Sequence, residues 1–280
     1  MADDLTTYHE NTWCPGCGNF GLLNALKKAV LALEKKGVPR EKLIQTTGIG
    51  CHGKMSDYIA LSGFATLHGR ALAVAQGIKL ANPELRVFSS VGDGDTIGEG
   101  LEHLVFAAKR NADITALIHN NGVYALTTGQ VTPVSERGFR GPSTPLGNPE
   151  DPLNPLALML ESGATFVARG YAGKVDHLAG LIVRAIEHEG FSYIDILQPC
   201  VSFNNTYERY NKTTEVMQEP PASYDDAVRA VKRRDKLLLG VFYEAKKAPF
   251  HIEVQGDRNP AAQRLPRQDR VDRVRKLLEA

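Results

Sequence analysis

Apolar residues along this chain alternate between two patterns, a helical spacing and short continuous runs. Between residues 19 and 36 they recur at helical spacing, and Gly37 and Pro39 then end the pattern, which is typical of an amphipathic helix. The same spacing predicts helices over 70–81, 100–110 and 174–188, and short apolar runs predict strands over 43–47, 86–91, 114–119, 165–168 and 193–197. Strands that are regularly separated by helices predict an α/β fold, with a mostly parallel sheet covered by helices on both faces.

Two stretches depart from this alternation. Residues 127–155 are rich in Gly and Pro and have no periodicity, and such long loops in compact domains are usually functional or disordered. After about residue 205 the chain becomes charged and is interrupted by Pro, with helical stretches over 225–234 and 267–278. We therefore expect one domain over 1–205 and a C-terminal extension over 206–280, which packs on the core or on a partner subunit.

Composition narrows the classes of function. The 280 residues include 33 Lys and Arg against 32 Asp and Glu, and a net charge of +1 provides no field that attracts nucleic acid or an anionic membrane. The first residues contain acids where a secretory signal needs bases, and no apolar run reaches the roughly 20 residues that span a bilayer. We expect a cytoplasmic globular protein that binds neither nucleic acid nor membrane.

Two glycine motifs resemble nucleotide-binding loops, but each lacks a required residue. The stretch from Gly48 to Gly53 matches GxGxxG after a strand, yet no acidic residue follows about 20 positions later to bind a ribose. It continues into Lys54 and Met55, where a P-loop would place a Ser or Thr that reaches Mg²⁺. We therefore expect neither a dinucleotide enzyme nor an ATPase or GTPase.

Polar groups follow two successive predicted strands. Gly92-Asp93-Gly94-Asp95 follows the strand over 86–91, and Asn121, 28 positions after Asp93, follows the next one. Open α/β sheets bind ligands at the carboxyl ends of their strands, where glycines let backbone amides approach a diphosphate. Asp93 could merely cap a helix and Asn121 could belong to an ordinary turn. Together, however, they offer the oxygen ligands that Mg²⁺ prefers, and they predict a diphosphate–magnesium site.

All four cysteines lie at the ends of predicted elements. Cys14 and Cys17 form a C-x-x-C pair before the first helix, Cys51 follows the first strand, and Cys200 follows the last. The loops that carry them can converge, and four thiolates suit zinc or an iron–sulfur cluster equally well. Four unrelated buried thiols are the alternative. A reducing compartment argues against a disulfide framework.

Six motifs occur in an order that resembles one protein family. They are WCPGCG, TGIGCHGK, LHGRALAVAQGIKLANP, VGDGD, NNGVYALTTGQ and ILQPC, spread over about residues 12–205. In combination they resemble the beta subunit of the 2-oxoacid:ferredoxin oxidoreductases, which has a thiamine diphosphate-binding fold. The resemblance implies that Mg²⁺ is held by Asp93, Asn121 and the carbonyl of Val123. It also implies that one [4Fe–4S] cluster is held by all four cysteines.

The resemblance further implies which residues act on thiamine diphosphate. Lys54 and His68 would line its diphosphate and the reaction centre, although a surface lysine and a turn-capping histidine are the ordinary alternatives. At Thr128, the third residue of the implied catalytic set, the family often carries a Lys associated with the distal carboxylate of 2-oxoglutarate. The substrate therefore stays open among 2-oxoglutarate, pyruvate and branched 2-oxoacids. The other residues of the implied cofactor site are Gly50, Cys51, His52, Gly92, Asp93, Gly94, Asp95, Asn121, Val123, Tyr124, Leu126 and Thr127.

The implied activity is the coenzyme A-dependent oxidative decarboxylation of a 2-oxoacid. Thiamine supplies the carbanion chemistry, and a cluster passes single electrons to ferredoxin, which zinc cannot do. In this family the Glu that activates thiamine comes from an alpha subunit, and no Glu of this chain is an evident substitute. We expect an enzyme that is active only as a heterodimer with that subunit.

Two other functions compete with this one. A non-redox thiamine-dependent decarboxylase or synthase would use Asp93 and Asn121 but would need no cysteine cluster. A zinc-stabilised binding module would use the cysteines but would leave Gly92-Asp93-Gly94 without a role. Iron content and thiamine diphosphate binding distinguish the three.

Overall fold

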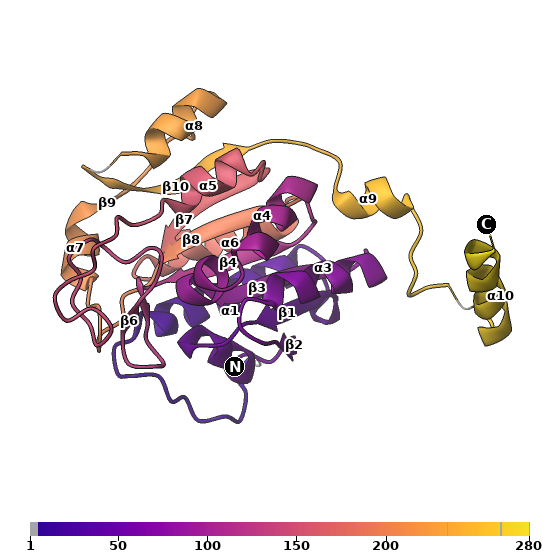
Figure 1. Ribbon diagram of the computed structural model, residues 1–280, viewed down its shortest axis with the longest axis horizontal. Coiled ribbons are helices and arrows are strands. Elements are labelled where there is room, and N and C mark those ends of the chain that lie inside the picture. The colour runs from indigo at the N-terminus through magenta and orange to yellow at the C-terminus, as the bar shows by residue number, and fades with distance from the viewer. Residues whose placement is uncertain (1–4, 234, 264, 280) are drawn as a thin grey trace.

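An eight-stranded sheet runs through the centre of the molecule, with strand order β2-β1-β3-β4-β8-β7-β10-β9 (Figure 1). This is a computed structural model, and it describes residues 5–233, 235–263 and 265–279. The strands from β2 to β7 in this order are parallel, whereas β10 is antiparallel to β7 and β9 is parallel to β10. The strand bounds are β1 (Leu43–Thr47), β2 (Ser62–Ala65), β3 (Arg86–Gly92), β4 (Thr115–Asn120), β7 (Phe166–Tyr171), β8 (Ser192–Leu197), β9 (Thr214–Val216) and β10 (Leu237–Glu244).

Helices cover both faces of the sheet. The apolar core on one face contains α1 (Gly18–Lys35), α6 (Val175–Glu187) and the short α2 (Met55–Tyr58). The core on the other face contains α3 (Ala71–Ala81), α4 (Leu101–Arg110), α5 (Pro155–Glu161) and α8 (Tyr224–Val231). Central strands such as β8 are buried at every position, as expected where helices cover both faces of a parallel sheet.

The remaining elements are short or peripheral. A two-stranded ribbon pairs β5 (Val123–Tyr124) with β6 (Gln130–Val131), inside the region predicted as an irregular loop. The chain continues beyond the sheet through α7 (Tyr207–Thr213), α9 (Phe250–Gln255) and α10 (Arg267–Leu278), and Figure 1 shows α10 standing apart from the sheet. No helix within the described ranges combines the length and the apolarity needed to cross a bilayer.

The predicted α/β class and its alternation of strands and helices are confirmed. The helix expected over 225–234 is α8, and Arg234 lies outside the described residues, as do residues 1–4 of the chain's opening. Strands β2, β9 and β10 were not predicted. Because β10 adds to the main sheet and buries Leu239 and Phe242, the segment after residue 205 contributes directly to the central sheet. The boundary at 205 itself stays a prediction.

Candidate functional site

A cleft opens at the carboxyl ends of three neighbouring strands, β1, β3 and β4. It encloses about 450 Å³ including its open mouth. The loop after β1 forms one wall, the turn after β3 forms the floor, and the β5 ribbon forms the opposite wall. The lining residues are Ile49, Gly50, Cys51, His52, His68, Gly92, Asp93, Gly94, Asp95, Asn121, Val123, Tyr124, Ala125, Leu126 and Thr127.

Asp93 is a fully buried carboxylate at the floor of this cleft. Its Oδ2 accepts a hydrogen bond of 2.7 Å from the Thr132 hydroxyl, and its Oδ1 accepts one of 3.2 Å from the backbone N–H of Asn121. Burial raises the pKa of Asp93 to about 6 despite these donors. A divalent cation would offset that cost of burial, so the side chain fits a metal ligand.

Asn121 is held on both sides of its side-chain amide. Its Oδ1 accepts from the Val123 N–H at 3.0 Å, and its Nδ2 donates to Gln198 Oε1 at 3.1 Å. Its backbone carbonyl accepts from Asn204 Nδ2 at 2.8 Å. The Asn121 oxygen has one further lone pair, which remains available for a metal at the cleft.

Two glycines of the Gly-Asp-Gly turn allow a close approach that no other residue would. A Cβ added at Gly92 would lie 2.6 Å from the His52 ring, and one added at Gly94 would lie 2.5 Å from the Tyr124 ring. Tyr124 also donates its hydroxyl to the Gly94 carbonyl at 3.0 Å. The backbone of Gly92 and Gly94 therefore packs directly against the rings of His52 and Tyr124. Because neither glycine has a side chain, space remains beside Asp93.

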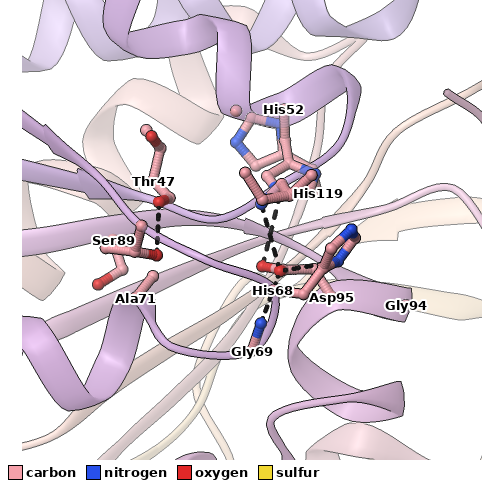
Figure 2. A network of polar contacts seen from close by, with 12 residues as sticks. Thr47, His52, His68, Gly69, Ala71, Ser89, Gly94, Asp95 and His119 are labelled. Atoms are coloured by element: carbon pink, nitrogen blue, oxygen red, sulfur yellow. Dashed lines mark hydrogen bonds and ion pairs between the residues drawn. The ribbon is translucent and has the colours of Figure 1, made fainter.

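Asp95 is the centre of a second buried polar group, shown in Figure 2. Its Oδ1 accepts from the Gly69 N–H at 2.9 Å, and it lies 3.6 Å from His68 Nδ1. Its Oδ2 lies 3.5 Å from His52 Nε2, and both atoms are buried without a hydrogen bond. Burial alone would raise the pKa of Asp95, but the His52 imidazole and the backbone donors outweigh it and leave the pKa lowered. The two atoms face each other within ion-pair distance, so His52, His68 and the Gly69 N–H together position the buried Asp95 carboxylate beside the cleft.

All four cysteines line a second cavity, which is distinct from the cleft. It encloses about 660 Å³ including its mouth, and Lys54, Gln198, Ser202 and Phe203 share its lining with them. Cys14 comes before α1, Cys17 is the N-cap residue directly before α1, Cys51 follows β1, and Cys200 follows β8. The convergence predicted from the sequence is therefore present in the fold.

Polar groups contact the thiols of this cavity. Ser202 Oγ lies 3.2 Å from Cys14 Sγ, Gln198 Nε2 lies 3.6 Å from Cys17 Sγ, and Trp13 Nε1 donates to the Cys51 carbonyl at 2.7 Å. Burial, with smaller contributions from the other three cysteines, raises the pKa of Cys17 to about 11. Four thiolates could share this cavity only if a positively charged centre compensated both the burial and their repulsion.

The two cavities are direct neighbours. Cys51, Asn121, Ala125 and Leu126 line both of them. A ligand in the cleft and a centre bound by the thiols would therefore be separated by a single layer of side chains.

The structure brings together nearly every residue predicted for the thiamine site. Two members of the set lie elsewhere. Lys54 lines the cysteine cavity and donates to Thr12 Oγ1 at 2.8 Å, so the structure does not place it at the cleft. Thr128 is exposed, has a φ of 78°, and is not among the lining residues.

Sequence reasoning missed several residues that support the two cavities. Thr132 and Ser135 come from the irregular stretch after β5, and they donate to Asp93 and to the Gly122 carbonyl. Gln198 and Trp13 lie within the ILQPC and WCPGCG motifs, where their position beside a cysteine was the available signal.

A buried aspartate and an asparagine at adjacent strand ends, with a glycine-lined cleft beside them, could hold a divalent cation together with a diphosphate. Residues 48–196 match the family described as thiamine pyrophosphate enzyme, C-terminal TPP binding domain. Residues 200–257 match the family that describes the C-terminal part of the pyruvate ferredoxin oxidoreductase beta subunit.

Individual relatives agree with these matches. The 2-oxoacid:ferredoxin oxidoreductase subunit beta of Saccharolobus solfataricus is 43% identical over 270 residues, which cover 90% of this chain and 87% of that one. The 2-oxoglutarate synthase subunit KorB of Archaeoglobus fulgidus is 40% identical over 71% of this chain and 73% of its own length. A solved structure of 2-oxoglutarate:ferredoxin oxidoreductase from Magnetococcus marinus, with 2-oxoglutarate, coenzyme A and succinyl-CoA bound, superposes with a TM-score of 0.89. That match has 34% identity and covers 98% of this chain and 96% of the other.

The chain belongs to the beta subunits of the 2-oxoacid:ferredoxin oxidoreductases. It is therefore part of an oxidoreductase that works with a partner alpha subunit and contains a thiamine diphosphate-binding domain.

Proposed function

We propose that this chain binds thiamine diphosphate, Mg²⁺ and one [4Fe–4S] cluster, and that with its alpha subunit it decarboxylates a 2-oxoacid oxidatively. Coenzyme A would accept the acyl group and ferredoxin the electrons. The observation that carries the proposal is the shared wall between the cleft and the cysteine cavity. A non-redox thiamine enzyme would have no use for such a neighbour.

Asp93, Asn121 and the Val123 carbonyl would hold the metal. Asp93 supplies a buried anionic oxygen, and Asn121 supplies a neutral one from the adjacent strand end. Two protein side chains leave Mg²⁺ the coordination positions that phosphate oxygens and water would take. Thr132 keeps the Asp93 carboxylate pointed at the cleft, because its hydroxyl fixes Oδ2.

The cysteine cavity would hold a cluster through four thiolates. It encloses about 660 Å³ including its mouth, and all four cysteines line it. A cluster of several iron and sulfide atoms requires its thiolates to stand farther apart than a zinc ion does, since zinc binds each sulfur at about 2.3 Å. Cys14 is exposed, which would bring one edge of the centre to the surface from which ferredoxin could take an electron.

Thiamine, when bound, supplies the electron sink for decarboxylation. The chain's own residues would orient and shield it. His52 and His68 face Asp95 beside the cleft, where they can hold protons near a bound cofactor. Ala125 and Leu126 form an apolar part of the shared wall. The alpha subunit would contribute the Glu that activates thiamine.

The substrate would be a monocarboxylate such as pyruvate if this subunit alone recognised it. No Lys or Arg lies among the described residues that line the cleft. A second carboxylate costs several kcal/mol to bury unless a cation or several donors meet it, and Thr128, where the family often carries Lys, is uncharged and does not line the cleft. Recognition of 2-oxoglutarate would therefore need a cation from the alpha subunit.

One anaerobic preparation of the complete heterodimer tests the proposal. We expect about four irons per beta chain, a brown chromophore that dithionite bleaches, one thiamine diphosphate, and reduction of ferredoxin that depends on a 2-oxoacid and coenzyme A. Zinc without iron would contradict the cluster. Bound thiamine diphosphate with 2-oxoacid decarboxylation but no ferredoxin reduction would instead identify a non-redox thiamine enzyme.

A further inference from the structure

Gln198 lines the cysteine cavity and is hydrogen-bonded to Asn121, which lines both cavities. It follows β8 directly and is 1% exposed. Its Oε1 accepts from Asn121 Nδ2 at 3.1 Å, on the side of the thiamine cleft. Its Nε2 lies 3.6 Å from Cys17 Sγ and also donates to the Pro199 carbonyl at 2.8 Å. Both polar atoms of the Gln198 side chain, Oε1 and Nε2, therefore have partners, and together they link Asn121 to Cys17.

The direction of these hydrogen bonds is fixed by chemistry. The Pro199 carbonyl can only accept, so Nε2 must face it, and the same nitrogen then lies beside Cys17 Sγ. The oxygen of Gln198 must then face Asn121, and this forces Asn121 to present its nitrogen to Gln198. As a result the Asn121 oxygen stays on the side of the cleft, where a metal ligand is needed. If Gln198 were reversed, two N–H groups would oppose each other.

We propose that Gln198 is a positioning residue that couples the thiamine site to the cysteine site, so that occupancy of one changes the electron affinity of the other. The inference rests on the proposed function, because it requires both centres. A metal bound to the Asn121 oxygen polarises that amide and makes its N–H a stronger donor. Gln198 relays the polarisation, since hydrogen bonds in series strengthen one another in a buried environment.

The sign of the coupling follows from the direction of the relay. A stronger N–H···S contact stabilises the additional negative charge of a reduced cluster and so raises its reduction potential. Binding of thiamine diphosphate with Mg²⁺ should therefore raise that potential. By reciprocity, the reduced protein should bind the cofactor more tightly than the oxidised protein.

The test compares Gln198→Met with Ser202→Ala in the anaerobic heterodimer. Methionine keeps the length of the side chain but removes both its amide contacts. Ser202→Ala is the matched control, because it also removes a donor to a thiol, 3.2 Å from Cys14, and no hydrogen bond within the described chain links Ser202 to Asn121. For each protein, the cluster potential is titrated with and without thiamine diphosphate and Mg²⁺, and cofactor affinity is measured by calorimetry.

In the wild type we expect the cofactor to bind about tenfold more tightly to the reduced state, which for one electron corresponds to a rise of about 59 mV. Ser202→Ala should lower the potential but keep this rise. Gln198→Met should lower the potential, abolish most of the rise, and weaken cofactor binding severalfold. If Gln198→Met does not fold, Gln198→Glu serves in its place, since it keeps an oxygen for Asn121 but has no N–H for Cys17.

Two outcomes overturn the inference. One is a cluster potential in the wild type that does not respond to thiamine diphosphate and Mg²⁺, and the other is a full response that persists when Gln198 is replaced. A wild-type protein that lacks the cluster or the cofactor would overturn the proposed function as well. The iron and thiamine contents of each sample therefore distinguish the two failures.

Discussion

Single residues at the cleft have separable roles, and Asp93 is the clearest case. It is the only carboxylate assigned to the proposed metal, and it does not line the cysteine cavity. Asp93→Ala should therefore abolish thiamine diphosphate binding, while the visible spectrum of the cluster stays unchanged. Calorimetry and absorption spectra of one sample measure both. Asp176→Ala, which changes an exposed carboxylate on α6, should bind the cofactor as the wild type does. Unchanged affinity of Asp93→Ala would show that the metal assignment is wrong.

Thr128 tests the charge argument about the substrate. Thr128→Lys should shift the ratio of kcat/KM toward 2-oxoglutarate and away from pyruvate by about tenfold, or about 1.4 kcal/mol. Thr128→Met is the matched control, because it adds length without charge. Both variants keep the positive φ of 78° at this position, so backbone strain affects them alike. An unchanged ratio in Thr128→Lys would place substrate selection in the alpha subunit.

At the scale of elements, one buried ion pair joins two strands just below the cleft. Asp195 on β8 accepts from Arg169 on β7 at 3.1 Å and from Asn120 at the end of β4 at 2.8 Å. Asp195→Ala would leave the Arg169 charge buried and unpaired, which should reduce the free energy of unfolding by about 3–5 kcal/mol. Chemical denaturation followed by circular dichroism measures this loss. Glu208→Ala breaks the exposed pair with Lys212 and should change nothing measurable. Equal effects of the two substitutions would contradict this account.

The sequence predicted the central elements well and the peripheral ones poorly, for physical reasons. Strands β3, β4 and β8 are buried on both faces, so apolar residues occur at successive positions in each of them, even though β3 includes Ser89 and Ser90 and β8 includes Asp195. Strand β2 is exposed at every position and has no such run. Strand β10 does contain an apolar run, but the charged, Pro-interrupted stretch before it is typical of a peripheral extension. Its antiparallel pairing with β7 depends on tertiary contacts that no local pattern encodes.

In the candidate site, too, residues that follow a regular strand were predicted, whereas residues in an irregular loop were missed. Asp93 and Asn121 were predicted because they follow strands, and parallel α/β sheets bind ligands at the carboxyl ends of their strands. Thr132 was not, since it reaches Asp93 from an irregular loop whose path has no periodic signal. The location of Lys54 beside the cysteines also could not be foreseen, because a long flexible side chain can reach either cavity from the same backbone position.

For the whole molecule, the segment after residue 205 should be essential up to β10 and dispensable beyond α9. Ending the chain at residue 205 would remove β10, expose the edge of β7, and uncover the surface that Leu239 and Phe242 cover. We expect this truncation to be insoluble. Ending the chain at residue 256 removes α10, which contains no buried residue, and should leave the fold intact. Soluble yield and far-UV circular dichroism decide between these outcomes, and a soluble, folded 1–205 fragment would contradict this view.

The convergence of four cysteines on one cavity also has a consequence for how the protein is made. Cys14 and Cys200 are separated by 186 positions. At synthesis rates of roughly 5–20 residues per second, Cys200 follows the start of the chain by about 10–40 s. For the last 149 of those positions, after Cys51 has been made, three thiols exist without the fourth, and unprotected thiols are open to oxidation. Oxygen present while the chain is being synthesised should therefore reduce the yield of active enzyme more than the same exposure after the cavity has closed.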